Sequence, residues 1–327
     1  MPEWLVERGI GEVRAALVEE GRILQARIEL EGAVPVGAIL EVRLTRVGPH
    51  GRNAVATDLE GREYLLAQAP QRITEGAQLV VEVTREAIPG TEPWKRPRAR
   101  ASDREACALE PLEQRLGRGS PVRELPFPPN RADALGEAGW GDVMEEASSA
   151  EVGFDGGSLT ISLTPAMTLI DVDGWLAPAE LSVAGAAAAA RAIRRLDIGG
   201  SIGIDLPTVA GKAARQRAAE AIDASLPQPF ERTQVNGFGF VQIVRPRLRP
   251  SLPEIWADRP SAEARAVLRR AALERTGPTR LVAHRAVTSV LERNPLWLAT
   301  LSRQIGGAVT LRSEPTLPIH GAYAEAG

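Results

Sequence analysis

Two short apolar runs that each end in carboxylates constrain this chain more than any other feature. The first is Leu169-Ile170-Asp171-Val172-Asp173, and the second belongs to the string from Asp197 to Asp205. Each apolar run predicts a buried strand. The alanine content of Ala179–Leu196, which lies between them, predicts a helix. A strand, a helix and a second strand can bring the terminal acids side by side at one edge of a sheet.

The acids at these strand ends have two interpretations. Paired carboxylates at strand ends suit Mg²⁺, which prefers hard oxygen ligands and keeps several waters. In the other interpretation, Asp171 and Asp205 are polar strand ends that face solvent. Spacing alone favours the solvent-facing interpretation, so the choice depends on the rest of the sequence.

Length and charge limit the classes of function. With 327 residues, of which 44% are hydrophobic, the chain can bury a large core in two or three domains. The 39 bases and 42 acids give a net charge of −3. This balance argues against bulk coating of nucleic acid but permits a local basic stripe. The densest basic run is Trp94–Arg100, a solvated charge run by default, to which Trp94 adds a surface for base stacking.

Other classes are excluded by residues that the chain lacks. Cys107 is the single cysteine, so no intramolecular disulfide can form. One cysteine and three scattered histidines cannot supply a common structural zinc site. The longest apolar stretch, Ala184–Ala190, is too short to span a membrane, and the charged start of the chain has no signal-peptide core. We therefore expect a cytoplasmic protein with no membrane partner.

The first half of the chain predicts strands followed by a linker. Residues 1–35 contain two strand-like runs around a glycine turn. Residues 36–100 contain several short strands separated by glycine, which suggests a small OB-type barrel. Residues 101–150 are rich in Pro, Arg, Gly and Glu and predict a linker or loosely packed segment. The predicted barrel strands are Ile39–Val47, Asn53–Asp58, Glu63–Leu66 and Gln78–Thr84.

The second half predicts two α/β units. Residues 151–252 follow the pattern strand, strand, helix, strand, helix, strand, which is typical of an α/β layer. Residues 253–327 predict a smaller α/β unit with helices near 262–273, 284–292 and 297–305. The pair Gly199-Gly200 precedes a strand, so it does not form a dinucleotide-binding fingerprint.

Several motifs occur together in one order between residues 156 and 252. They are the Gly156-Gly157-Ser158 opening, the two acid-ending strings, and the string Arg245-Pro246-Arg247-Leu248-Arg249-Pro250-Ser251-Leu252. In this order the chain resembles the catalytic half of the ribonuclease E/G family. Glu7–Gly21 looks like the opening strand pair of that family, and Gly37–Val47 is similar to the entry strand of its inserted OB-type domain. Several motifs in register are more specific than any single one.

The resemblance implies a ribonuclease H-like α/β catalytic domain with an inserted OB-type β-barrel RNA-binding domain and a small C-terminal α/β domain. Residues 1–35 then supply the first strands of the ribonuclease H-like domain, and 36–100 form the barrel. Residues 101–150 are a linker or reduced sensor region. Residues 151–252 complete the catalytic domain, and 253–327 form the C-terminal domain.

The activity that the resemblance implies is Mg²⁺-dependent endonucleolytic cleavage of single-stranded RNA, in RNA processing or decay. Asp171 and Asp205 fall on the two metal-binding aspartates of the family. Asp173 falls where the family usually has a supporting asparagine, so it joins the candidate catalytic residues. Its extra charge can add a metal ligand, or it can repel Asp171. The remaining alternative for Asp173 is a solvated loop acid.

Candidate RNA-binding residues come from two parts of the chain. In the barrel, Tyr64 matches a family aromatic, Val55 replaces another, and Lys95 matches a lysine. In the catalytic part, basic residues are expected to contact phosphates, which positions RNA without reading its sequence. These basic residues are Lys212, Arg215, Arg245 and Arg247.

The sequence also departs from the family. The interval before Gly156 is too short for the 5′-end sensor, and the zinc-linking Cys-x-x-Cys string is absent. We therefore expect no zinc, and either a monomer or a homodimer. The alternative function is a non-catalytic or weakly catalytic RNA-binding protein that associates with RNA-processing machinery or the ribosome.

Overall fold

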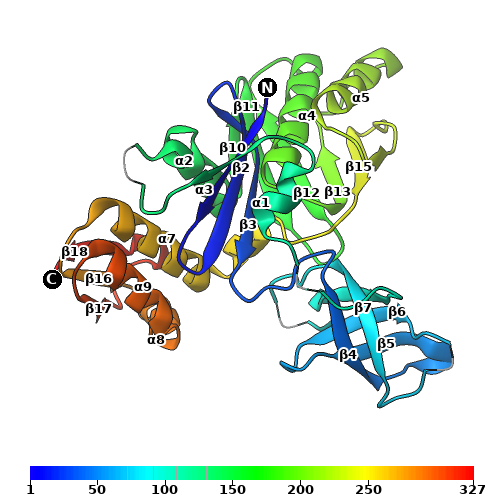
Figure 1. Ribbon diagram of the computed structural model, residues 1–327. Coiled ribbons are helices and arrows are strands. Elements are labelled where there is room, and N and C mark those ends of the chain that lie inside the picture. The colour runs from blue at the N-terminus through cyan, green and yellow to red at the C-terminus, as the bar shows by residue number, and fades with distance from the viewer. Residues whose placement is uncertain (72, 91, 108, 130–131) are drawn as a thin grey trace. The chain divides into compact units, whose positions relative to one another are not determined.

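The computed structural model describes residues 1–71, 73–90, 92–107, 109–129 and 132–327 (Figure 1). The protein is a mixed α/β protein with a closed five-stranded barrel and several further sheets. Its contacts divide into two compact units. The first unit comprises Met1–Glu31, Leu112–Ser148 and Ile255–Gly327, and the second comprises Gly32–Pro111 and Ser149–Glu254. No helix in the described ranges is long and apolar enough to cross a bilayer.

The first unit contains a four-stranded sheet and a three-stranded sheet. The four-stranded sheet has the order β3-β2-β1-β9, and β9 runs parallel to β1. The three-stranded sheet has the order β17-β16-β18. The strands are β1 (Glu3–Arg8), β2 (Glu12–Glu19), β3 (Arg22–Leu30), β9 (Val122–Leu125), β16 (Thr279–Ala283), β17 (Val309–Ser313) and β18 (Tyr323–Ala326). In the described pairings, β1, β2 and β3 join no strand of residues 151–252, so these two segments contribute to different sheets.

The helices of the first unit lie in two parts of the chain. The sequence predicts helices in one part and a linker in the other. α7 (Arg259–Glu274), α8 (Arg285–Arg293) and α9 (Pro295–Ile305) agree with the predicted C-terminal helices. α1 (Leu112–Gly117), α2 (Ala134–Glu137) and α3 (Trp140–Ser149) lie in the predicted linker. Leu112, Leu116, Leu135 and Trp140 are buried. The expectation of a loosely packed linker is therefore wrong for 112–149, because a few well-spaced apolar side chains suffice to dock these short elements.

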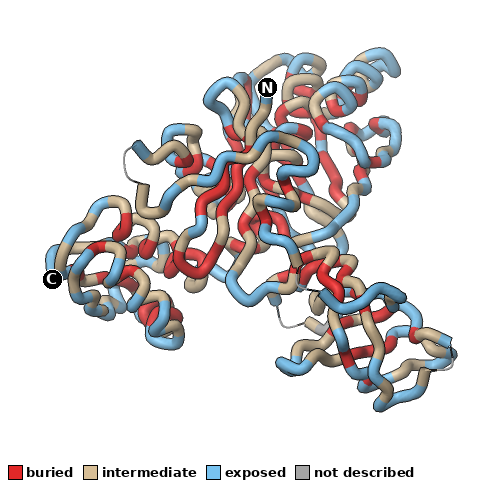
Figure 2. Tube along the Cα trace, viewed as in Figure 1, coloured by how far each residue is buried: buried red, intermediate tan, exposed pale blue. Residues whose placement is uncertain are grey.

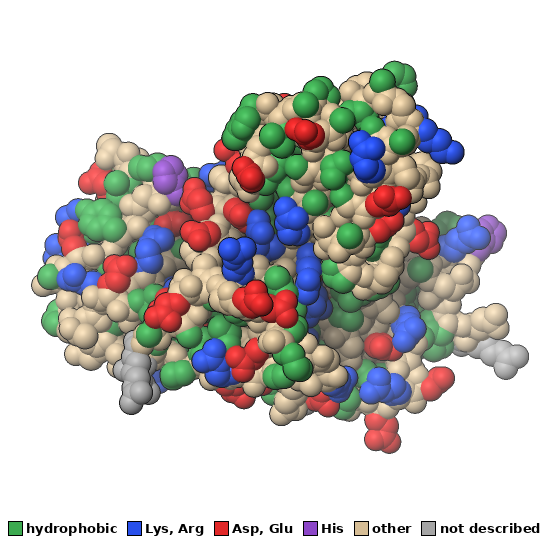
Figure 3. Space-filling model, turned by 90° about the horizontal axis from the view of Figure 1, so that it is seen from above, with side chains coloured by type: hydrophobic (Ala, Val, Ile, Leu, Met, Phe, Trp, Pro, Cys, Tyr) green, Lys and Arg blue, Asp and Glu red, His purple; other side chains and the backbone are tan. Residues whose placement is uncertain are grey.

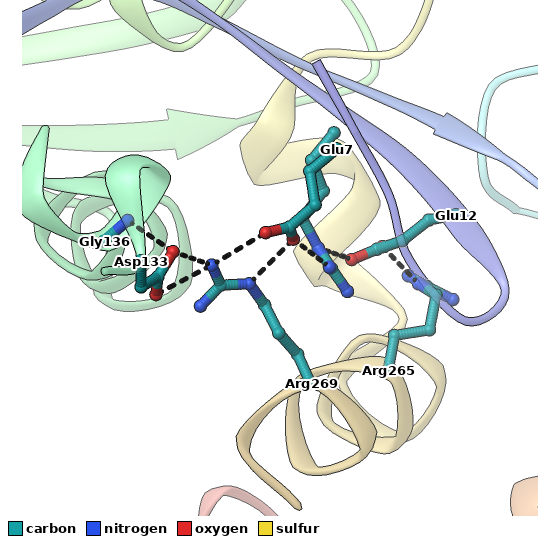
Figure 4. Close-up of polar contacts among 7 residues, drawn as sticks. Glu7, Glu12, Asp133, Gly136, Arg265 and Arg269 are labelled. Carbon is teal, nitrogen blue, oxygen red and sulfur yellow. Dashed lines mark hydrogen bonds and ion pairs between the residues drawn. The ribbon is translucent and has the colours of Figure 1, made fainter. Parts of the chain in front are cut away.

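The first unit also contains a cluster of six charged side chains, four of them buried and two partly buried, and Figure 4 labels most of them. Glu7, Glu12 and Asp133 supply the negative charges, and Arg14, Arg265 and Arg269 supply the positive ones. We call these six residues the buried charge cluster. Every carboxylate in it accepts from at least one guanidinium, so its charges balance, as a buried ionic group requires.

Short distances join the members of this cluster. Arg14 Nη1 lies 2.6 Å from Glu7 Oε1, and Arg14 Nε lies 2.6 Å from Glu12 Oε1. Arg265 Nε lies 2.8 Å from Glu12 Oε2. Arg269 bridges Glu7 at 3.0 Å and Asp133 at 2.8 Å. The arginines of α7 thereby tie the C-terminal segment to strands β1 and β2.

The second unit begins with the predicted barrel. Its closed strand order is β4-β5-β6-β8-β7, which confirms a five-stranded barrel within residues 36–101. The strands are β4 (Ile39–Arg46), β5 (Arg52–Thr57), β6 (Glu63–Gln68), β7 (Gln78–Arg85) and β8 (Arg98–Ala101). The closing strand β8 comes from the basic run, where Ala99 is buried between exposed Arg98 and Arg100. Strand alternation explains how a charged run can complete a barrel.

The second unit continues with a six-stranded sheet in the order β10-β11-β12-β13-β15-β14. β12 and β13 are parallel, and the other neighbours are antiparallel. The strands are β10 (Glu151–Phe154), β11 (Gly157–Leu163), β12 (Thr168–Gly174), β13 (Gly200–Asp205), β14 (Glu231–Arg232) and β15 (Phe240–Arg245). Its helices are α4 (Pro178–Arg195) and α5 (Lys212–Ser225), and α6 (Leu252–Ala257) contains the boundary between the two units.

The two faces of this sheet differ. Ile170, Val172, Ile202 and Ile204 are buried on the face that α4 covers. Figure 2 shows that buried positions run through the strands. A Cβ atom at Gly185 of α4 would lie 2.3 Å from Val172 Cγ1, so glycine is required there for the close approach of helix and sheet. The acids alternate with these apolar residues, and they are therefore directed to the opposite face.

Candidate functional site

Asp171 and Asp205 meet in the six-stranded sheet. β12 and β13 run parallel, and the Cα atoms of Asp171 and Asp205 are register partners. Neighbouring strands lie about 4.8 Å apart, so the two carboxylates are close neighbours. Both residues are exposed, whereas the preceding partners Ile170 and Ile204 are buried on the other face. The structure thus brings together the two acids that the sequence singled out.

Neither carboxylate of this pair is used by the fold. Within the described residues, the side chains of Asp171 and Asp205 make no hydrogen bond or ion pair. Two free carboxylates on adjacent strands suit Mg²⁺, which is often held by one or two carboxylates and completes its shell with water and phosphate oxygens. The donor chemistry of the pair therefore fits this cation.

Asp173 lies two residues further along β12, on the same side as Asp171, and it is also exposed. Its register partner on β11 is Ser158. The pairing of β12 with β13 ends at Asp171 and Asp205, so Asp173 lies beyond the last residue of β13. No three His, Cys, Asp or Glu side chains of the described ranges are grouped so that they could hold a metal ion. Asp173 therefore does not complete a three-ligand site with the pair.

Two basic residues follow Asp205 at the carboxyl end of β13. Lys212 is the first residue of α5 and is exposed. Arg215 is half-buried, and its Nη1 donates to the backbone oxygen of Val209 at 3.4 Å. Lys212 therefore has a free ammonium group at this end of the sheet, while Arg215 is partly engaged by its own loop.

The remaining predicted arginines lie at the opposite end of β13. Arg245 is the register partner of Gly200, the first residue of β13, whereas Asp205 is the last. Five residue steps along a strand separate these ends by about 16 Å. The structure therefore does not bring Arg245 and Arg247 to the carboxylate pair.

These arginines have protein partners instead. Arg245 Nη1 donates to the backbone oxygens of Ile198 at 2.9 Å and Ile193 at 3.5 Å, and burial lowers its pKa. Arg247 forms an ion pair with Glu254. The expectation that Arg245 faces RNA is wrong, because its guanidinium is directed inward and closes the end of α4.

The barrel corrects a second expectation. The side chain of Tyr64 is fully buried, with 0% exposure, and its hydroxyl donates to Asp58 Oδ2 at 2.8 Å. Burial and this hydrogen bond raise the pKa of Tyr64. Val55 is buried as well. Neither residue offers a surface for RNA, because Tyr64 alternates to the inside of the barrel.

The accessible aromatic side chain of the barrel is Trp94. Residues 32–111 contain two Phe, Tyr or Trp residues, Tyr64 and Trp94, and Trp94 is 58% exposed. The backbone of this turn is held by buried Arg85, whose Nη2 donates to the Trp94 carbonyl oxygen at 2.7 Å. Burial, with a smaller contribution from nearby Arg98, lowers the pKa of Arg85 to about 10. Lys95 is half-buried and lies 3.1 Å from Glu92.

Sequence reasoning about the carboxylate edge missed Trp175, which directly follows β12 and is 79% exposed. The signal was a large apolar residue immediately after the acidic string.

On the face shown in Figure 3, small groups of basic side chains alternate with acidic ones. Local clusters, and not a large single-sign patch, therefore set the electrostatics of this face.

Two comparisons with known proteins found no match. No protein-family model matches the chain, and no curated protein matches it. The resemblance to the ribonuclease E/G family therefore stays a prediction from the motifs.

Proposed function

We propose that this protein is a Mg²⁺-dependent endoribonuclease that cleaves single-stranded RNA. The observation that carries the proposal is the register pairing of Asp171 with Asp205, both exposed and both without a partner among the residues that the structure describes. The proposal depends on this pair, and the ribonuclease H-like class of the domain remains a separate prediction.

The chemistry follows from the two carboxylates. A Mg²⁺ ion held there supplies a Lewis acid for a phosphate oxygen and a bound water of lowered pKa. Asp171 and Asp205 would hold the cation from adjacent strands. Hydrolysis adds water across the P–O3′ bond: the water oxygen joins phosphorus, and its proton goes to the O3′ leaving group. The products are a 5′-phosphate and a 3′-hydroxyl.

Other residues support the binding of RNA. Lys212 places a free positive charge beyond the end of β13, where it can contact a backbone phosphate. The barrel carries exposed Trp94 beside exposed Arg98 and Arg100. OB-type barrels bind single strands through such combinations of positive charge and aromatic surface.

The test is cleavage of an end-labelled single-stranded RNA in Mg²⁺. Asp171→Asn and Asp205→Asn are each expected to lower kcat/KM by about a thousandfold, since Lewis-acid stabilisation contributes several kcal/mol. Asp103→Asn is the matched control, because Asp103 is an exposed acid outside the sheet. Equal activity of the two site variants and the control would overturn the assignment.

A second candidate function is RNA binding without cleavage. The absence of a three-ligand metal group in the described part of the chain and the exposed Trp94 favour it. In that case the wild-type protein binds RNA with a steep salt dependence, and Mg²⁺ yields no product.

A further inference from the structure

Two large aromatic side chains are exposed at the same edge of the six-stranded sheet as the carboxylate pair. Trp175 is 79% exposed and Phe238 is 82% exposed. Trp175 directly follows the end of β12. Phe238 lies two residues before Phe240, the register partner of Asp205. Both aromatics therefore lie beyond the carboxyl ends of the strands that hold the acids.

The strands that lead to the two aromatics lie on either side of β13. Trp175 continues β12, whereas Phe238 leads into β15, and β13 lies between these strands. Two strand spacings separate β12 from β15 by about 10 Å. Asp205 ends β13 between them, and Asp171 lies four residues before Trp175 on β12 itself.

The backbone at Trp175 is fixed before any ligand arrives. The N–H of Trp175 donates to the backbone oxygen of Gly156 at 3.1 Å. A Cβ atom at the preceding Gly174 would lie 2.2 Å from the same oxygen, so the two chains touch here. The indole projects from a tight corner that has little freedom to rearrange.

The backbone at Phe238 is held as firmly. Its N–H donates to Asn236 Oδ1 at 2.9 Å, and its carbonyl oxygen accepts from Thr208 Oγ1 at 2.9 Å. Gly239 follows with φ +97°, and a Cβ atom there would lie 2.1 Å from the Leu206 carbonyl oxygen. The loop after Asp205 and the loop before Phe240 are thus joined at Phe238 and Gly239.

Chemistry decides which ligand suits these rings. A flat aromatic surface beside a candidate cation site and exposed Lys212 matches a ligand that carries both phosphates and aromatic rings. Nucleic acid has this combination, and every nucleobase presents a π-face for stacking. A duplex hides these faces inside its stack, so only unpaired bases can reach both rings.

We propose that Trp175 and Phe238 stack on unpaired nucleobases on either side of the phosphate at the carboxylate pair. They thereby make the site selective for single strands. This inference rests on the proposed function for the identity of the ligand, and it adds the residues that select a single strand. Because both backbones are held in place, little ordering is required when the bases bind.

The test measures binding in EDTA, where no cleavage occurs. The probes are a fluorescently labelled 12-nucleotide RNA, a hairpin duplex of similar charge and an abasic ribose-phosphate oligomer. Trp175→Ala and Phe238→Ala are each expected to weaken binding of the single strand by about tenfold, as loss of one stacked base predicts. Trp175→Phe and Phe238→Trp are expected to restore most of it. Leu296→Ala is the control, because Leu296 is 76% exposed on α9 of the first unit, outside both proposed RNA-binding regions.

The outcomes separate the two proposals. If the alanine variants bind the single strand as the wild-type protein does, or lose affinity equally for the abasic oligomer, base stacking is wrong. It is also wrong if these variants retain RNA affinity and only their self-association weakens. If all variants lose affinity as expected but wild-type protein never cleaves RNA in Mg²⁺, stacking stands and the endoribonuclease proposal fails.

Discussion

The buried charge cluster of the first unit and the carboxylate edge of the second unit use the same kinds of residue in opposite ways. In the cluster, Glu7 and Glu12 share the guanidinium of Arg14, whose side chain is 1% exposed. At the edge, Asp171 and Asp205 are exposed and have no partner among the described residues. A protein gains stability by pairing its charges and leaves them free where a ligand must bind.

Removing one member of the cluster tests its structural role and has the largest expected effect on stability. Arg14→Met leaves Glu7 and Glu12 buried with less compensation, so the free energy of unfolding should fall by about 3–5 kcal/mol. Urea unfolding followed by circular dichroism measures the change. Arg123→Met is the control, because its ion pair with Glu3 is exposed and should contribute less than about 1 kcal/mol. Equal effects of the two substitutions would contradict the comparison.

Arg245 and Lys212 sharpen the comparison within the second unit. Arg245→Met removes donors from the Ile198 carbonyl and should cost about 1–3 kcal/mol of stability. RNA affinity of the folded Arg245→Met protein should stay unchanged.

Lys212→Met should leave stability unchanged and reduce the slope of log K against log salt by about 1. Thermal unfolding and RNA titrations at several salt concentrations check both, and a shallower salt slope for Arg245→Met would contradict its structural role.

Much of the second unit could be predicted from its sequence. Short strand-like runs separated by glycine locate four of the five barrel strands, and apolar runs with terminal acids locate β12 and β13. Because parallel strands that end on acids align those acids, the pairing of Asp171 with Asp205 was also predictable.

Other features depend on partners far away in the chain. Arg269 pairs with Glu7 across 262 positions, and no local pattern indicates that contact. Tyr64 points inward because of the register of β6 in the barrel. A shift of one residue in that register would turn its side chain outward. Arg245 and Arg247 alternate as an RNA-facing strand would, but Ile198 and Glu254 determine where they point.

Asp58 extends the comparison to the barrel and should make its stability depend on pH. Burial alone would raise the pKa of Asp58, but hydrogen bonds from the Arg62 N–H, the Tyr64 hydroxyl and the Arg62 side chain outweigh it and lower the pKa below 3.8. The folded form then binds a proton less readily than the unfolded form. The stabilisation from Asp58 is complete above the unfolded pKa and is lost as pH falls through the folded pKa.

The measurement for Asp58 is the melting temperature of wild-type protein and Asp58→Asn between pH 7 and pH 3. The wild-type advantage should be constant at neutral pH and shrink below about pH 4, the ordinary range of an aspartate. An advantage that persists unchanged at pH 3 would show that the carboxylate charge does not matter there.

The smallest expected effect on stability comes from the carboxylate edge itself. Asp171 and Asp205 repel one another across adjacent strands, so Asp171→Asn should raise the free energy of unfolding by less than about 1 kcal/mol.

Wild-type protein should gain thermal stability on addition of Mg²⁺, because a ligand that binds only the folded form stabilises it. The Asp171→Asn, Asp205→Asn double variant should lose that response while it keeps its fold. Asp173→Asn should retain most of the response, since Asp173 lies outside the pair. If Mg²⁺ stabilises the double variant as much as wild-type protein, the free acids hold no cation, and the contrast with the buried charge cluster reflects solvent exposure alone.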